Sequence, residues 1–137
     1  HSYSSAASDV YKRQSTYYAP DGTNLTDHPS IRSRFMKALG DQNLERQLDK
    51  LSQNKKAQLS MKQMYKDIRD GKRAQYDARN YWHNGKIDQL FQAARKKAWA
   101  SIMADPEIAA LIKEQRDAKL DKVLKLRDTT NILNIYK

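Results

Sequence analysis

Apolar side chains recur at intervals of three and four residues along much of this sequence, and that spacing constrains the fold more than any other feature. Residues three and four apart lie on the same side of an α-helix. Ile31, Phe35 and Leu39 make one such stripe, and a longer one runs from Ile87 to Ile102. Only four Gly and three Pro are present, so the turns that a multi-stranded sheet needs are scarce. The sequence therefore predicts an all-α fold, a small bundle of four or five helices.

Three helices are predicted in the front half of the chain, each with recognisable end signals. The first runs from Pro29 to Leu39, because Pro suits a first helical turn and a following Gly40 favours a stop. A short second helix is expected from about Asn43 to Ser52. The third is expected from about Lys55 to Asp70, where Gly71 ends the pattern.

The back half predicts two longer helices separated by Asp105-Pro106-Glu107, a cap followed by Pro at the first helical position. The earlier of the two begins either at about Asp77 or only after Asn84-Gly85. The later one runs from Pro106 to about Arg127, at the end of a single helical domain predicted over residues 29–128. Its apolar stripe lapses midway, which favours a helix that leaves the body or pairs with another chain.

The last nine residues, 129–137, are predicted to form a separate apolar peptide. It either folds back over the helices in an extended form or docks on a partner as a terminal peptide. Its apolar residues, which are the candidate docking contacts, are Ile132, Leu133, Ile135 and Tyr136.

Charge and composition limit the classes of partner that this chain is expected to have. Its 137 residues suffice for one domain, and 26 Lys and Arg against 16 Asp and Glu give a net charge of +10. Such an excess favours a polyanionic partner such as nucleic acid, although the bases and acids are interspersed. The absence of Cys excludes disulfides and thiolate metal sites. No apolar run could span a bilayer and no secretory segment is present, so we expect no membrane partner and a location in the cytoplasm or within a virion.

The sequence offers little catalytic chemistry. His28 and His83 lack neighbouring acids at metal-ligand spacing, and no phosphate-binding glycine loop occurs. Asp117 and Lys119 have the D-x-K spacing of some nucleases, but they fall on a predicted helix with no strand to complete such a site. We therefore expect no catalytic residues, no cofactor, no metal and no small-molecule substrate.

The stretch RNYWHNGK, Arg79 to Lys86, combines bases with aromatics and admits two interpretations. In the first it is architectural: Tyr81 and Trp82 anchor a helix junction, and Gly85 takes the positive φ of a helix stop. In the second it grips a polyanion, because bases neutralise phosphates while aromatic faces stack on unpaired nucleobases. Both hold if one aromatic points inward and the other outward. The candidate polyanion contacts are Arg69, Lys72, Arg73, Arg79, Tyr81, Trp82, Lys86, Arg95 and Lys96.

The beginning of the chain is unlike the rest. Residues 4–14, SSAASDVYKRQ, resemble a translated sequencing-adapter segment rather than a folding unit, and residues 1–16 are predicted to be disordered. The resemblance implies a natural sequence that starts near Ser15 and leaves open that the chain is the C-terminal piece of a longer protein. A turn-rich lead-in follows over residues 17–28.

Three functional hypotheses remain. The first is a non-enzymatic interaction module that binds a polyanion, or that assembles with protein or with itself in a larger particle. The chain's small, capped, charged helices are similar in style to segments of phage and mobile-element proteins, although no motif carries that likeness. The second is an accessory C-terminal region of an enzyme. The third is a helix-turn-helix DNA-binding protein, for which Arg46 and Lys50 against Glu45 and Asp49 are a poor reading surface.

Overall fold

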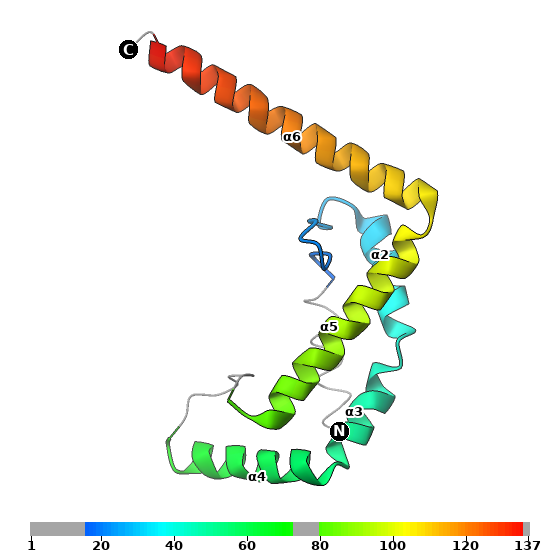
Figure 1. Cartoon of the computed structure of the whole chain (residues 1–137), viewed down its shortest axis with the longest axis vertical. Helices are drawn as coiled ribbons and strands as arrows, with labels where there is room; N and C mark the ends of the chain where they lie inside the picture. The colour runs from blue at the N-terminus through cyan, green and yellow to red at the C-terminus, as the bar shows by residue number, and fades with distance from the viewer. Residues whose placement is uncertain (1–15, 73–79, 136–137) are drawn as a thin grey trace. The chain divides into compact units, whose positions relative to one another are not determined.

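The computed structural model describes residues 16–72 and 80–135, and the side chains up to residue 128. Within these ranges it contains α-helices and no β-strand, which confirms the predicted all-α fold (Figure 1). The helices are α2 (Pro29–Gly40), α3 (Leu44–Ser52), α4 (Lys55–Arg69), α5 (Trp82–Met103) and α6 (Pro106–Ile135). The chain divides into two compact units, one ending at Ile102 and the other beginning at Met103.

The lead-in, residues 17–28, forms the turn that its Pro-Asp-Gly sequence indicates. Thr16, which the sequence placed in the disordered segment, is instead fully buried. Gly22 has a φ of 88°, a backbone conformation that favours glycine. The Ala19 N–H donates to the Thr23 carbonyl at 2.8 Å, and Asp21 accepts from the Thr23 hydroxyl at 2.6 Å. Leu25 is fully buried, so the turn is fixed to the helical core of the first unit.

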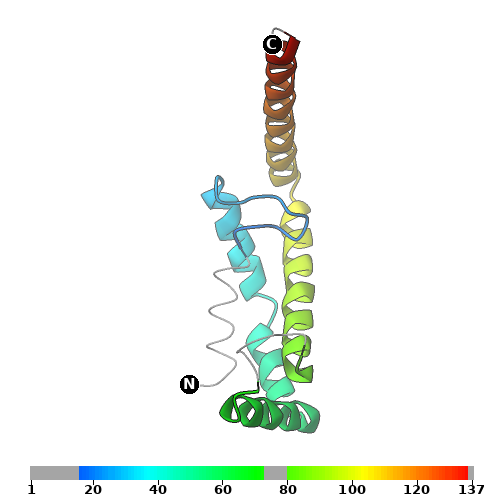
Figure 2. The same cartoon turned by 90° about the vertical axis from the view of Figure 1, so that its left-hand side faces the viewer.

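Helices α2 and α3 lie along α5, and α4 crosses near the start of α5, as the two views show (Figures 1 and 2). The predicted stripe of α2 is confirmed, since Ile31, Phe35 and Leu39 are all buried. The Phe35 ring meets Trp99 of α5 edge to face, with the ring centroids 5.5 Å apart. This arrangement suits two aromatic rings because the positive edge of one faces the negative face of the other.

The ends of α4 follow directly from two residues. The Asn54 side chain caps the helix by accepting from the backbone N–H of Lys56 at 2.8 Å. Gly71, with a φ of 69°, ends it as predicted. On the inner face of α4, Ala57 and Met64 are buried, whereas Ile68 near the end of the helix is 37% exposed.

Helix α5 supplies the longest buried stripe. Its fully or nearly fully buried apolar residues on the predicted face are Ile87, Phe91, Ala94, Ala98 and Ile102. Phe91 has no exposed surface. Because these positions recur every three or four residues, α5 packs one continuous apolar face against the rest of the first unit. This packing fixes the position of the residues at the start of α5.

Helix α6 begins where predicted and continues further than predicted. Asp105 caps it by accepting from the Glu107 N–H at 3.0 Å. It extends to Ile135 rather than to about Arg127, so residues 131–135 continue the helix and do not form a separate extended segment. No helix of the described residues is both long and apolar enough to cross a membrane.

Candidate polyanion-binding surface

Within the stretch RNYWHNGK, residues 82–86 form the beginning of a helix and not the end of one. Helix α5 starts at Trp82, and Gly85 lies inside its first turns, where its N–H donates to the Tyr81 carbonyl at 3.1 Å. The predicted positive φ at Gly85 is therefore wrong, because only Gly22 and Gly71 among the glycines of the described part have a positive φ. Arg73 and Arg79 lie outside the described residues.

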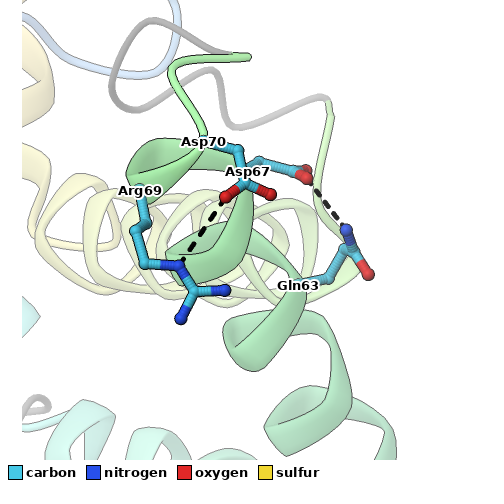
Figure 3. A network of polar contacts seen from close by, with 4 residues as sticks. All are labelled: Gln63, Asp67, Arg69 and Asp70. Carbon is cyan, nitrogen blue, oxygen red and sulfur yellow. Dashed lines mark hydrogen bonds and ion pairs between the residues drawn. The ribbon is translucent and has the colours of Figure 1, made fainter.

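Tyr81 points into the protein. Its side chain is 7% exposed, and its hydroxyl donates to Asp67 Oδ2 on α4 at 2.9 Å. The other Asp67 oxygen accepts from Gln63 Nε2 at 2.8 Å, which holds the carboxylate on this side of α4 (Figure 3). Tyr81 thus joins the start of α5 to α4, as the architectural interpretation requires.

His83 is also inside, with 1% of its surface exposed. Its Nδ1 lies 2.9 Å from Ser60 Oγ, and its backbone N–H donates to the same oxygen at 3.4 Å. Its Nε2 is buried and has no hydrogen-bond partner among the described residues. Burial lowers the pKa of His83 from its ordinary value of 6.5, because desolvation disfavours the charged ring. The ring is therefore neutral at pH 7 and serves packing.

Trp82 is oriented differently from its two neighbours. Its side chain is only half-buried, and two ammonium groups lie over its ring: Lys56 Nζ at 5.1 Å and Lys86 Nζ at 5.6 Å from the ring centroid. Both distances are within the range of a cation–π contact. We call Lys56, Trp82 and Lys86 the Trp82 cluster. It combines a partly open aromatic surface with two positive charges.

The outer side of α4 carries a row of bases that we call the α4 basic stripe: Lys55, Lys62, Lys66 and Arg69. Their spacing of seven, four and three residues puts them on one face, opposite the buried Ala57 and Met64. All four are exposed, and the stripe covers about 21 Å at 1.5 Å per residue. It reaches the Trp82 cluster at the first turn of α4, where Lys55 and Lys56 are consecutive.

Two apolar side chains lie exposed beside this stripe, Leu59 at 59% and Tyr65 at 60%. Tyr65 is not among the contacts predicted from the sequence. Its position one residue from Met64 turns it about 100° away from the core, a rotation that the helical period itself predicts. Tyr65 thus adds an accessible aromatic ring to the stripe.

The remaining predicted contacts divide into exposed bases and one structural base. Lys72 and Lys96 are exposed. Arg69 Nε lies 3.7 Å from Asp70 Oδ1 in an ion pair at the surface (Figure 3). Arg95 instead donates to the Tyr18 carbonyl at 2.7 Å and to Gln92 Oε1 at 3.2 Å. Arg95 therefore attaches the lead-in turn to α5.

The described residues contain no group of three or more acidic, His or Cys side chains that could hold a metal ion. A shallow hollow of about 430 Å³ lies at the turn between α2 and α3, lined by Gly40, Asn43, Leu44, Glu45, Arg46 and Asp49. Its two acids against one base disfavour a phosphate there. Comparison of the chain with protein families, curated proteins and solved structures found no match.

Proposed function

We propose that this chain is a non-enzymatic helical module that binds a polyanion through the α4 basic stripe and the adjoining Trp82 cluster. All the bases of α4 except Lys56 lie on one exposed face of the helix. The proposal rests on this observation. The sequence of α4 holds five bases and a single acid, Asp67. That acid is hydrogen-bonded to Tyr81 and Gln63, so its charge is directed to the junction with α5.

Such a row of bases suits the backbone of a nucleic acid. Phosphates on one strand succeed each other about every 3.4 Å along a duplex axis, so a stripe of about 21 Å can follow roughly six of them. Each phosphate neutralised by a base releases a condensed counterion, which makes binding favourable at low salt. The exposed rings of Tyr65 and Trp82 supply surfaces that can contact sugars or unpaired bases.

The salt dependence of binding tests the proposal. The affinity for a short DNA duplex, and for a single strand of the same length, is measured by fluorescence anisotropy between about 50 and 200 mM salt. We expect the logarithm of the affinity to fall linearly with the logarithm of the salt concentration, by about 0.9 per phosphate contacted on the duplex. Binding that is absent at low salt, or independent of salt, would contradict the proposal and favour assembly with protein instead.

A matched pair of variants locates the contact. Lys62→Gln/Lys66→Gln removes two charges from the α4 basic stripe, and we expect the salt slope to fall by about 2. Lys37→Gln/Lys50→Gln removes the same charge from exposed positions on α2 and α3. It should leave the slope nearly unchanged. Equal losses in the two variants would show that net charge, and not this stripe, governs binding.

A further inference from the structure

Helix α6 carries two apolar triplets with the same spacing but different surroundings. Ile108, Leu111 and Ile112 form the first, in which both Ile side chains are buried. The second lies twelve residues later and consists of Leu120, Val123 and Leu124, which are 58%, 53% and 47% exposed. We call this second triplet the α6 apolar seam.

The two triplets face different directions. At about 100° per residue, twelve residues turn a helix by about 120° beyond three full turns. Whatever surface covers the first triplet therefore does not cover the α6 apolar seam if it continues straight along the helix. Three large apolar side chains at the i, i+3 and i+4 positions are typical of a helix that packs against another element.

The acids beside the seam are gathered on one flank. Four acids share one flank, because spacings of three, four and seven residues return to the same side of a helix: Glu114, Asp117, Asp121 and Asp128. The other flank carries Arg116 and Lys119, and Lys122 lies further round the helix, on the side away from the seam. All seven side chains are exposed. The segregation concerns the acids and not every base. Lys125 lies on the acid side, where its Nζ is 3.4 Å from Asp121 Oδ2, and Arg127 lies in line with the seam, but no acid of α6 lies on the flank of Arg116 and Lys119.

From this arrangement we infer that the α6 apolar seam pairs with the same seam of a second copy of this chain, with the two helices parallel. In a parallel pair related by a two-fold axis along the helices, the acid flank of each copy faces the basic flank of the other. In an antiparallel pair, acids would face acids and bases would face bases. Flanking charges set partner choice and orientation in paired helices, and here they select the parallel self-pair.

The seam is short, and this limits its strength. Arg127 occupies the position seven residues after Leu120 and so closes the apolar contact after about two turns. The pairing is accordingly reversible and depends on protein concentration. It does not depend on the α4 basic stripe, because none of the seam or flank residues belongs to that helix.

Sedimentation analysis of the full chain over a range of concentrations is the first test. The mass is expected to rise from 15.9 kDa toward twice that value as the concentration increases, and to do so less at high salt. Leu124→Asp should keep the chain monomeric. Leu126→Asp makes the same chemical change at an exposed leucine on another side of the helix, and it should leave the association intact. A monomer at every concentration, or equal effects of the two variants, would overturn the inference.

Disulfide trapping tests the orientation of the two helices. Because the sequence contains no Cys, only the introduced residue can form a cross-link. Leu120→Cys and Arg127→Cys are prepared as separate variants and oxidised. A parallel pair brings each residue opposite itself, so both variants should cross-link, whereas Lys122→Cys on the far side should not. An antiparallel pair can bring only one of the two positions opposite itself. Cross-linking at one position or at neither would refute the parallel arrangement.

Charge reversal supplies a third result. Asp117→Lys/Asp121→Lys puts two bases on the acid flank, and Arg116→Glu/Lys119→Glu puts two acids on the basic flank, so each variant should lose self-association. A mixture of the two should form a heterodimer, because every flank then faces its opposite. If the mixture remains monomeric while the original chain associates, another surface is responsible and the seam is not the interface.

Discussion

Helices α5 and α6 are the two longest helices among the described residues, and they use their apolar residues in opposite ways. The apolar face of α5 is buried along most of its 22 residues. In α6, with 30 residues, the α6 apolar seam is about half exposed. The same three- and four-residue spacing produced both helices. The comparison teaches that periodicity predicts a helix and its apolar face, whereas burial of that face depends on what lies beside it.

The largest expected effect comes from deleting one apolar side chain in each helix. Phe91→Ala removes a fully buried ring from α5 and should lower the free energy of unfolding by about 3–5 kcal/mol. Leu120→Ala removes a largely exposed side chain from α6 and should change it by less than about 0.5 kcal/mol at low protein concentration. Denaturant titrations of both variants measure the difference. If the two variants lose similar amounts of unfolding free energy, the apolar faces of the two helices do not differ in burial.

Helices α5 and α6 also differ in how they begin. A variant at the start of α5 should have a smaller effect on the free energy of unfolding. Tyr81→Phe removes the hydroxyl that joins the start of α5 to Asp67, and should lower the free energy of unfolding by about 1 kcal/mol. Global unfolding followed by denaturant titration measures this loss. Tyr65→Phe, at an exposed tyrosine of α4, is the control and should leave the stability nearly unchanged.

A local effect is expected at the start of α6. Asp105→Ala removes the side chain that caps the helix, a change that typically costs about 1 kcal/mol of helix stability. Because the cap acts on the first turn, hydrogen exchange should accelerate for amides near Glu107 more than for amides in α5. Uniform acceleration throughout both helices would show instead that α6 and α5 unfold together.

The smallest expected effect is a pH dependence from the buried His83 at the start of α5. Since burial lowers its pKa below 6.5, the unfolded chain takes up the proton first as the pH falls. The contribution of neutral His83 is complete above about pH 6.5 and declines below it until the folded-state pKa is reached. His83→Gln should remove this decline, whereas His28→Gln should keep it. Unfolding free energies measured between pH 7.5 and about 5 provide the check.

Local signals predicted most of the helix ends. Pro29, Gly71 and the Asp105-Pro106 pair act on the backbone within one turn, so the sequence carries their effect in full. Gly85 was misjudged because a glycine also fits inside a helix when its neighbours pack well, as Ile87 and His83 do. The end of α6 was placed too early because Thr and Asn are weak helix formers, which the structure nevertheless includes in the helix.

The candidate site was predicted only in part. The bases were evident from composition, but the orientations of Tyr81 and Trp82 depend on contacts with Asp67 and Lys56, residues more than ten positions away. Adjacent positions at a helix start diverge by about 100°, so one ring is buried and the next is partly open. Which of the two rings is buried depends on tertiary contacts, and no local sequence pattern predicts it. The binding role of these residues stays a prediction.

The two tryptophans occupy contrasting environments, and this gives the protein two built-in optical probes. Trp99 is 8% exposed and lies against Phe35, whereas Trp82 is partly open beside two lysines. A small neutral quencher such as acrylamide should therefore reach Trp82 first, and unfolding should shift the emission of Trp99 to longer wavelengths. With Trp82→Phe and Trp99→Phe prepared separately, one spectrum would follow the surface of the first unit and the other its interior.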